Sequence, residues 1–200
     1  YKYGMMPWNG KAKEYREGKL IFDGEYIEGE KKGKEYDENG RLVFEGEYKN
    51  KKRWRGKVNE YNYFNKLILE GEYVEGEKRQ GIFKEIYYEN IKSEMEFNNG
   101  KGKGKEYDNN GNIIFDGQYI NVKFDEEKKY FLKGYFSRER WDGIEKKYDN
   151  ENKLLFEGKY KKGVKSGKEY DSEGKIIFEG DYLNEKRFNG KGKEYYNNGK

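Results

Sequence analysis

The chain has 200 residues, of which 41% are charged and 32% belong to the hydrophobic set. That balance is typical of disordered segments when aromatic residues are scarce, but 21 Tyr, 12 Phe and 3 Trp can build a thin core. The net charge is +4 and the two signs alternate along the chain, so no basic groove is predicted and nucleic acid is not an expected partner. The chain contains no His and no Cys, which excludes disulfides and Cys or His metal sites.

The sequence shows no membrane or export signal. No stretch approaches the roughly 18 apolar residues that a membrane-spanning helix needs. The first residues, YKYGMMPWNGKAKEY, lack a charged segment followed by an apolar run, which is the pattern of a secretory signal. We therefore expect a cytoplasmic protein.

One five-residue string recurs along the chain: an apolar residue, an acid, Gly, a polar residue and Tyr. In chain order it reads FDGEY (22–26), FEGEY (44–48), LEGEY (69–73), FDGQY (115–119), FEGKY (156–160) and FEGDY (178–182), with weaker copies SEMEF (93–97) and LKGYF (132–136). A second string, GKEY or GKGKEY, alternates with it at 33–36, 102–107, 167–170 and 190–195. These strings predict a single repeat array over residues 1–200, with about eight and a half units of about 23 residues.

Both strings alternate residue by residue, as β-strands do. In LVFEGEY, Phe44, Gly46 and Tyr48 fall on one face, which we predict to be the buried one. The glycine leaves a slot in that face, and a ring from an adjacent hairpin could occupy it. The glycines of KGKGKEY (101–107) predict close approach by another layer.

The connections carry turn chemistry. DENG (37–40), DNNG (108–111) and DSEG (171–174) each place Asp first and Gly fourth, which suits a type I turn closed by a left-handed residue. The interval between the two tyrosines that flank such a turn is always 12 residues, whereas the other half-repeat varies, with 10 residues from Tyr26 to Tyr36 and 13 from Tyr48 to Tyr61. We therefore expect rigid hairpins of constant length, with insertions collected in the loops between them.

Two segments break the pattern. Residues 81–97 lack the D-x-x-G turn and the usual glycine, and residues 120–136 lack a recognisable GKEY string. Either the repeat has decayed there, or a bend or irregular patch makes a specific contact.

A unit reading F-E-G-E-Y-x-N-G-K-x-x-G-K-G-K-E-Y-D-x-x-G resembles the MORN repeat (membrane occupation and recognition nexus), in the variant form found in bacterial, protist and viral proteins. The resemblance covers the whole chain and is best at 10–73 and 143–199. It implies an all-β fold, an elongated single-layer ribbon of tandem antiparallel β-hairpins, and roles in scaffolding, dimerisation, protein contacts or lipid binding. The His that is frequent in the family's loop is absent here, and the copies at 81–97 and 120–136 are degraded.

Carboxylates are numerous, and a glycosidase would need a pair of them. However, Glu35, Glu45, Glu47, Glu106, Glu157 and Glu169 recur at fixed repeat positions, whereas a catalytic pair should be singular. We interpret them as a repeated solvent face and predict a protein that is not an enzyme, with no catalytic, metal-binding or cofactor-binding residues and no cofactor. The D-x-x-G turns lack the multiple acidic ligands of a calcium loop.

The best candidates for a functional feature are aromatic residues that stand two positions before a Gly in only some repeats. They are Trp8, Trp54, Trp141 and Phe188, and the basic residues Arg53, Arg55 and Arg140 flank them. Aromatic and arginine side chains are enriched at the energetic centres of protein interfaces, so these residues are predicted partner contacts. The alternative is that each ring folds back and covers the edge of its own hairpin.

The leading functional hypothesis is a non-catalytic repeat scaffold that binds a protein partner or associates with itself. The second hypothesis is a peripheral membrane or phospholipid-binding module, because the GKGK strands are rich in Lys and because the resemblance implies it. The third, an antitoxin-like role in a toxin–antitoxin pair, rests on analogy with bacterial relatives alone.

Overall fold

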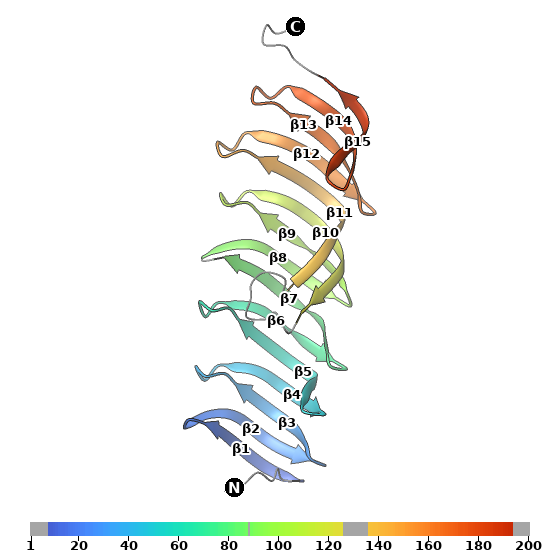
Figure 1. The fold of residues 1–200 in the computed structure, drawn as a ribbon. Coiled ribbons are helices and arrows are strands. Elements are labelled where there is room, and N and C mark those ends of the chain that lie inside the picture. The colour runs from blue at the N-terminus through green and yellow to red at the C-terminus, as the bar shows by residue number, and fades with distance from the viewer. Residues whose placement is uncertain (1–7, 88, 126–135, 194–200) are drawn as a thin grey trace. The chain divides into compact units, whose positions relative to one another are not determined.

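The computed structural model describes residues 8–87, 89–125 and 136–193. Their regular elements are fifteen β-strands, which are hydrogen-bonded to one another in chain order (Figure 1). This confirms the predicted all-β architecture of tandem antiparallel hairpins in a single sheet layer. The strands are β1 (Gly10–Arg16), β2 (Lys19–Ile27), β3 (Glu30–Tyr36), β4 (Leu42–Lys49), β5 (Lys52–Tyr61), β6 (Leu67–Val74), β7 (Glu77–Tyr87), β8 (Asn90–Asn98), β9 (Lys101–Tyr107), β10 (Ile113–Phe124), β11 (Phe136–Tyr148), β12 (Leu154–Lys161), β13 (Val164–Tyr170), β14 (Ile176–Leu183) and β15 (Lys186–Gly192).

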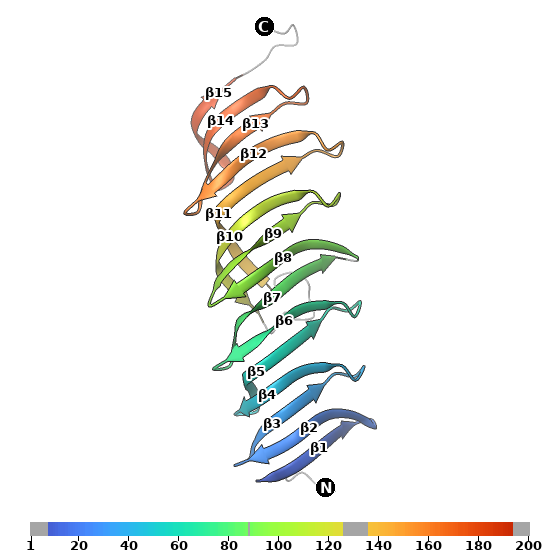
Figure 2. The same cartoon turned by 180° about the vertical axis from the view of Figure 1, so that it is seen from behind.

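The chain divides into two compact units. Unit 1 comprises Tyr1–Lys84 and Phe97–Asn99, and unit 2 comprises Glu85–Glu96 and Gly100–Lys200. Unit 1 therefore holds β1 to β6 and most of β7, and unit 2 holds β9 to β15 and most of β8. Within each unit, successive strands lie side by side in one layer, as the view from behind also shows (Figure 2).

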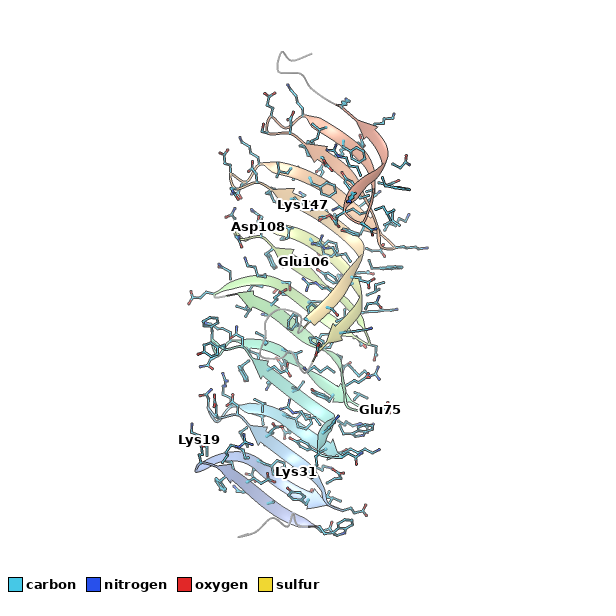
Figure 3. The ribbon with its side chains drawn as sticks, viewed as in Figure 1. Lys19, Lys31, Glu75, Glu106, Asp108 and Lys147 are labelled. Atoms are coloured by element: carbon cyan, nitrogen blue, oxygen red, sulfur yellow. The ribbon has the colours of Figure 1, made fainter. Side chains whose placement is uncertain are left out.

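Two kinds of turn connect the strands. The first has two residues with positive φ, such as Glu75 (55°) and Gly76 (83°) between β6 and β7, and this is the signature of the type I′ hairpin turn. The second is the predicted Asp turn: the Asp37 carboxylate accepts hydrogen bonds from the N–H groups of Asn39 and Arg41 at 2.9 and 3.0 Å. In unit 1, Glu75 lies in the turn between β6 and β7 at one end of the strands. Lys19, the first residue of β2, lies at the opposite end (Figure 3).

Glycines face one another across neighbouring strands. In unit 1 the registers Gly24↔Gly33, Gly33↔Gly46 and Gly46↔Gly56 form one continuous column. A Cβ built on Gly46 would lie 2.7 Å from the Cα of Gly56 and 2.8 Å from Cζ of Phe44. Two expectations were therefore wrong: the ring over the glycine belongs to its own strand, and the close approach comes from the adjacent strand of the same sheet.

The core of each unit is a row of aromatic rings on one face of the sheet. Phe44 is 1% exposed, and its ring centroid lies 5.2 Å from that of Tyr48 and 5.9 Å from that of Tyr73, both edge to face. Unit 2 repeats the arrangement: the ring of Phe115 meets that of Tyr160 at 5.8 Å. Edge-to-face packing of large rings over bare glycine backbone lets a single layer bury apolar area without a second sheet.

The longer half-repeats contain a β-bulge instead of a longer loop, which corrects the expected position of the insertions. In β5 the pairs Glu47↔Arg55 and Tyr48↔Arg53 leave Trp54 as the bulged residue. On its other side, β5 pairs with β6 two residues further along, through Val58↔Gly71. The three extra residues of the longer interval, 13 against 10, are therefore one bulge residue and a two-residue step in register.

In the irregular segment 120–136, residues 120–124 and Phe136 belong to an extension of the β10–β11 hairpin. Tyr119 pairs with Arg140 and Trp141 is bulged, as in the β4–β5 hairpin, but the strands continue to the pair Phe124↔Phe136 in place of a two-residue turn. The rings of Phe124 and Phe136 lie 5.3 Å apart. The weak copy expected at 132–136 lies outside the described residues, apart from Phe136. Segment 81–97 forms parts of β7 and β8.

Candidate functional site

A glutamate, a tyrosine and a cation from three successive strands form a repeated polar cluster on the aromatic face. In unit 1, Glu35 of β3 accepts hydrogen bonds from the Tyr48 hydroxyl at 2.6 Å and from Nε of Arg53 at 3.0 Å. The guanidinium of Arg53 also lies 5.1 Å from the ring centroid of Phe44. The same cluster recurs as Glu14–Tyr26–Lys31, Glu106–Tyr119–Arg138 and Glu169–Tyr182–Arg187.

This cluster overturns the interpretation that six recurring carboxylates form one solvent face. The side chain of Glu106 is only 14% exposed, and Glu35 and Glu169 also lie on the aromatic face. The other carboxylates point to the opposite face, where Glu45 and Glu47 pair with Lys34 and Lys32 at 3.7 and 3.2 Å, and Glu157 accepts a hydrogen bond from Tyr170. The two sets share a repeat but differ in their surroundings.

The pKa values of two clustered carboxylates, Glu106 and Glu169, are lowered. Burial on its own raises the pKa of Glu106, but a hydrogen bond from Arg140 and the charges of Arg138 and Arg140 outweigh it, so the pKa of Glu106 lies below its usual value. A hydrogen bond from Arg187 likewise lowers the pKa of Glu169. The carboxylates of Glu106 and Glu169 are therefore ionised at neutral pH and belong to the polar part of the core.

The predicted contact tryptophans lie over the turn of the next hairpin. The N–H of Gly76 donates to the carbonyl oxygen of Trp54 at 2.9 Å, and the indole lies over the same glycine. Trp8 meets Gly29, and Trp141 meets Gly163, in the same way. Trp54 and Trp141 are half-buried, whereas Trp8 is 68% exposed and Phe188, bulged in β15, is 71% exposed.

The predicted basic contacts divide between the two faces. Arg53 and Arg140 turn inward, with side chains 16% and 21% exposed, and each bonds a core glutamate. Arg55 is exposed on the opposite side of the bulge. Contact of the four aromatic and three basic residues with a partner stays a prediction.

Unit 2 contains an open cleft of about 720 Å³ beside the extended β10–β11 hairpin. Its apolar lining comes from Ile120, Phe136, Trp141 and Tyr160. Its polar lining includes Glu85, Glu106, Ser137, Arg138, Glu139, Arg140 and Glu185. The hairpin extension supplies Ile120 and the lining residues from Phe136 to Glu139, and two of these, Ile120 and Phe136, belong to the irregular segment.

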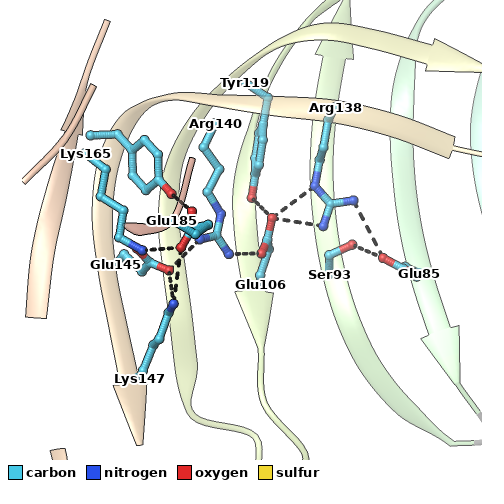
Figure 4. A network of polar contacts seen from close by, with 11 residues as sticks. Glu85, Ser93, Glu106, Tyr119, Arg138, Arg140, Glu145, Lys147, Lys165 and Glu185 are labelled. Carbon is cyan, nitrogen blue, oxygen red and sulfur yellow. Dashed lines mark hydrogen bonds and ion pairs between the residues drawn. The ribbon is translucent and has the colours of Figure 1, made fainter. Parts of the chain in front are cut away.

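The charges in the cleft form a connected network (Figure 4). Arg138 lies between Glu106 and Glu85, at 3.0 and 3.6 Å, and Ser93 donates to Glu85. Arg140 joins Glu106 to Glu145, as Figure 4 shows. Both arginines are thus engaged by carboxylates of the sheet face.

Lys165 extends this network to the next hairpins. Its Nζ lies 2.8 Å from Glu145 and 2.7 Å from Glu185, and Lys147 approaches both carboxylates. Glu185 remains 61% exposed while it makes these contacts. Glu139 is exposed at the cleft and accepts a hydrogen bond from the uncharged amide of Asn121 at 2.9 Å, so its carboxylate supplies the negative charge that faces solvent there.

An aromatic loop tip in unit 1 escaped the sequence-based predictions. Between β5 and β6 the chain reads NYFN where other loops read D-x-x-G, and Tyr63 and Phe64 stand at the tip with 94% and 47% exposure. The Asn62 side-chain oxygen accepts hydrogen bonds from the N–H groups of Phe64 and Lys66 at 3.0 Å each. The sequence does distinguish this loop. The second and third residues are polar in the four D-x-x-G or D-x-x-N loops, whereas here they are aromatic.

Two absences hold for residues 8–87, 89–125 and 136–193. No group of three or more His, Cys, Asp or Glu side chains there is arranged to hold a metal ion. No helix there has the length and hydropathy of a membrane span.

No protein-family model matches the chain, and no curated protein matches it significantly. The resemblance to MORN repeats accordingly stays a prediction.

Proposed function

We propose that this chain is a non-catalytic repeat scaffold that binds protein through the aromatic tip of the β5–β6 loop. The observation that carries the proposal is the exposure of Tyr63 and Phe64 on a loop that is fixed by hydrogen bonds. Tyrosine is enriched at the centres of protein interfaces, where it adds a large contact area at low entropic cost.

The loop is held in place before any partner arrives. The N–H of Asn65 donates to the carbonyl oxygen of Asn62 at 3.0 Å, and the N–H of Asn62 donates to the carbonyl oxygen of Lys66 at 2.9 Å. Arg41 of the neighbouring hairpin donates to the side-chain oxygen of Asn65 at 3.1 Å and lies 4.0 Å from the ring centroid of Tyr61. A fixed loop loses little conformational entropy on binding, which favours affinity.

The non-catalytic part of the proposal is supported by repetition. The glutamates and arginines that a catalytic site would use are engaged with tyrosines at equivalent positions of several hairpins, as in Glu35 with Tyr48 and Glu169 with Tyr182. On the opposite face, lysines lie across from carboxylates, for example Lys13 and Asp23 at 3.0 Å. Such balanced pairs do not favour an anionic lipid surface, so we do not propose the membrane function.

The test compares two double variants. Tyr63→Ser with Phe64→Ser removes the aromatic tip, and Glu38→Ser with Asn39→Ser changes the same positions of the neighbouring Asp loop. Each purified protein is immobilised, exposed to lysate and to soluble wild-type chain, and the retained proteins are quantified by mass spectrometry.

We expect the aromatic-tip variant to lose a protein that both the wild type and the Asp-loop variant retain. Both variants should unfold at the wild-type urea concentration, because the substituted side chains are exposed. Identical retained proteins for all three chains would contradict the proposal.

A further inference from the structure

The aromatic tip and the cleft of unit 2 have complementary chemistry. The tip presents Tyr63 and Phe64, followed by the exposed residues Lys66 and Leu67. The tip therefore combines two rings, an aliphatic side chain and one positive charge within five residues. A surface that fits it needs an apolar recess with negative charge at its rim.

The cleft offers that combination. Phe136, Trp141 and Tyr160 line it, and its volume of about 720 Å³ lies in the range of cavities that enclose groups of this size. Its arginines are already bonded to Glu106 and Glu145, so they do not repel an entering cation in full. The exposed carboxylate of Glu139, whose hydrogen-bond partner Asn121 is uncharged, can then pair with the cation.

We infer that the aromatic tip of one copy docks into the cleft of a second copy. This inference rests on the proposed function and names its partner. The rings of Tyr63 and Phe64 enter beside Trp141, and the ammonium group of Lys66 pairs with Glu139 at the rim. Electrostatic complementarity of this kind selects the partner and orients it.

The geometry of such a contact has a clear consequence for assembly. The tip and the cleft are different surfaces, so the interface is heterologous, and after pairing one copy keeps an unused cleft and the other keeps an unused tip. A contact made by a single loop buries less than about 1,200 Å², which belongs to the weak, transient class. Association should therefore continue beyond dimers and require high protein concentration.

Three proteins test the inference: the wild type, the Tyr63→Ser/Phe64→Ser tip variant, and a cleft variant with Ser137→Arg and Glu139→Lys. Both substituted cleft residues are exposed and line the cleft. The control is Glu151→Lys, at a loop tip of the same unit, where the side chain is 73% exposed. Sedimentation equilibrium up to several hundred micromolar gives the association constant of each protein, and urea unfolding confirms that each is folded.

We expect the wild type and Glu151→Lys to associate beyond dimers, and each of the other variants to associate at least about tenfold more weakly. An equimolar mixture of the tip and cleft variants should form heterodimers and nothing larger, since one intact tip and one intact cleft remain. A monomeric wild type, or a mixture that stays monomeric, overturns the inference. If the tip variant still loses a heterologous protein in the retention experiment, the proposed function stands without it.

Discussion

The indole of Trp54 lies over Gly76, a residue of the next hairpin's turn, and the two are also joined by a backbone hydrogen bond of 2.9 Å. A Cβ on Gly76 would lie 3.5 and 3.6 Å from two ring carbons, which is ordinary van der Waals contact. Trp54 is therefore the unpaired residue of the bulge, and its side chain connects its own hairpin to the next one.

This link predicts different costs for two similar substitutions. Trp54→Ala removes a ring that covers the neighbouring turn and should destabilise the protein by about 1–3 kcal/mol. Phe188→Ala, at the equivalent bulge of β15, removes a ring that is 71% exposed and should cost less than about 0.5 kcal/mol. Urea unfolding measures both, and equal costs would argue against the link.

The column of facing glycines predicts that one added methyl group strongly lowers the stability of the protein. In Gly46→Ala the new Cβ meets the backbone of β5, including the Cα of Gly56 at 2.7 Å, and backbone cannot turn aside as a side chain can. We expect a loss of about 3 kcal/mol or more. The control is Gly40→Ala, in open space with φ of 77°, where left-handed backbone alone should cost about 1–2 kcal/mol. Thermal or urea unfolding compares the two, and a smaller cost at Gly46 would count against the close approach.

A buried ion pair in unit 1 predicts strong coupling. Lys78 Nζ lies 2.9 Å from Glu60, with side chains 2% and 0% exposed. Lys78→Met removes the positive charge beside the buried carboxylate of Glu60 and should cost about 3–5 kcal/mol, because breaking a buried ion pair is strongly destabilising. Adding Glu60→Gln should recover much of that loss, and a double-mutant cycle in urea measures the coupling. Additive effects of the two substitutions would show that the pair is not coupled.

The polar core of unit 2 predicts a loss of stability in acid. The pKa of Glu106 is lowered in the folded state, because hydrogen bonding and charge from its two arginines outweigh burial. A lowered pKa contributes stability above the unfolded value of about 4.3 and loses it as the pH falls through the folded value. Glu106→Gln should therefore be less stable than the wild type at pH 7, and the difference should shrink below about pH 4.

Urea unfolding across this pH range provides the measurement. Glu173→Gln, whose side chain is 69% exposed, serves as the control and should follow the wild type at every pH. A constant difference between Glu106→Gln and the wild type from pH 7 to pH 3 would contradict the prediction.

Local chemistry was enough to predict the hairpins. Asp37 and Gly40 specify their turn through side-chain hydrogen bonds and positive φ, and Phe44 marks the buried face through alternation. Residue alternation predicted the wrong face of the sheet where a β-bulge shifted the register of the strand. Counting back from Gly56 places Trp54 inside and Arg53 outside, and the bulge reverses the position of Arg53.

The candidate site was less predictable because it depends on contacts between distant parts of the chain. Glu85, Glu106 and Arg138 meet although they lie in three different strands, and no local pattern encodes that meeting. The aromatic tip was readable in principle, since Tyr63 and Phe64 replace polar residues of a turn. The loop does not match the D-x-x-G turn pattern, because its first residue is Asn62 in place of Asp.

The two-residue step at β5 relates the number of residues between successive tyrosines to the displacement of neighbouring hairpins. Where the interval is 10 residues, as at β3, the facing glycines stay at the same level. Where it is 13, as at β5, the next hairpin is displaced along the strand direction by roughly 7 Å, at about 3.3 Å per residue. A designer could therefore set the pitch of an artificial array by ordering short and long units. A tryptophan two residues before the glycine would mark each position where the column shifts.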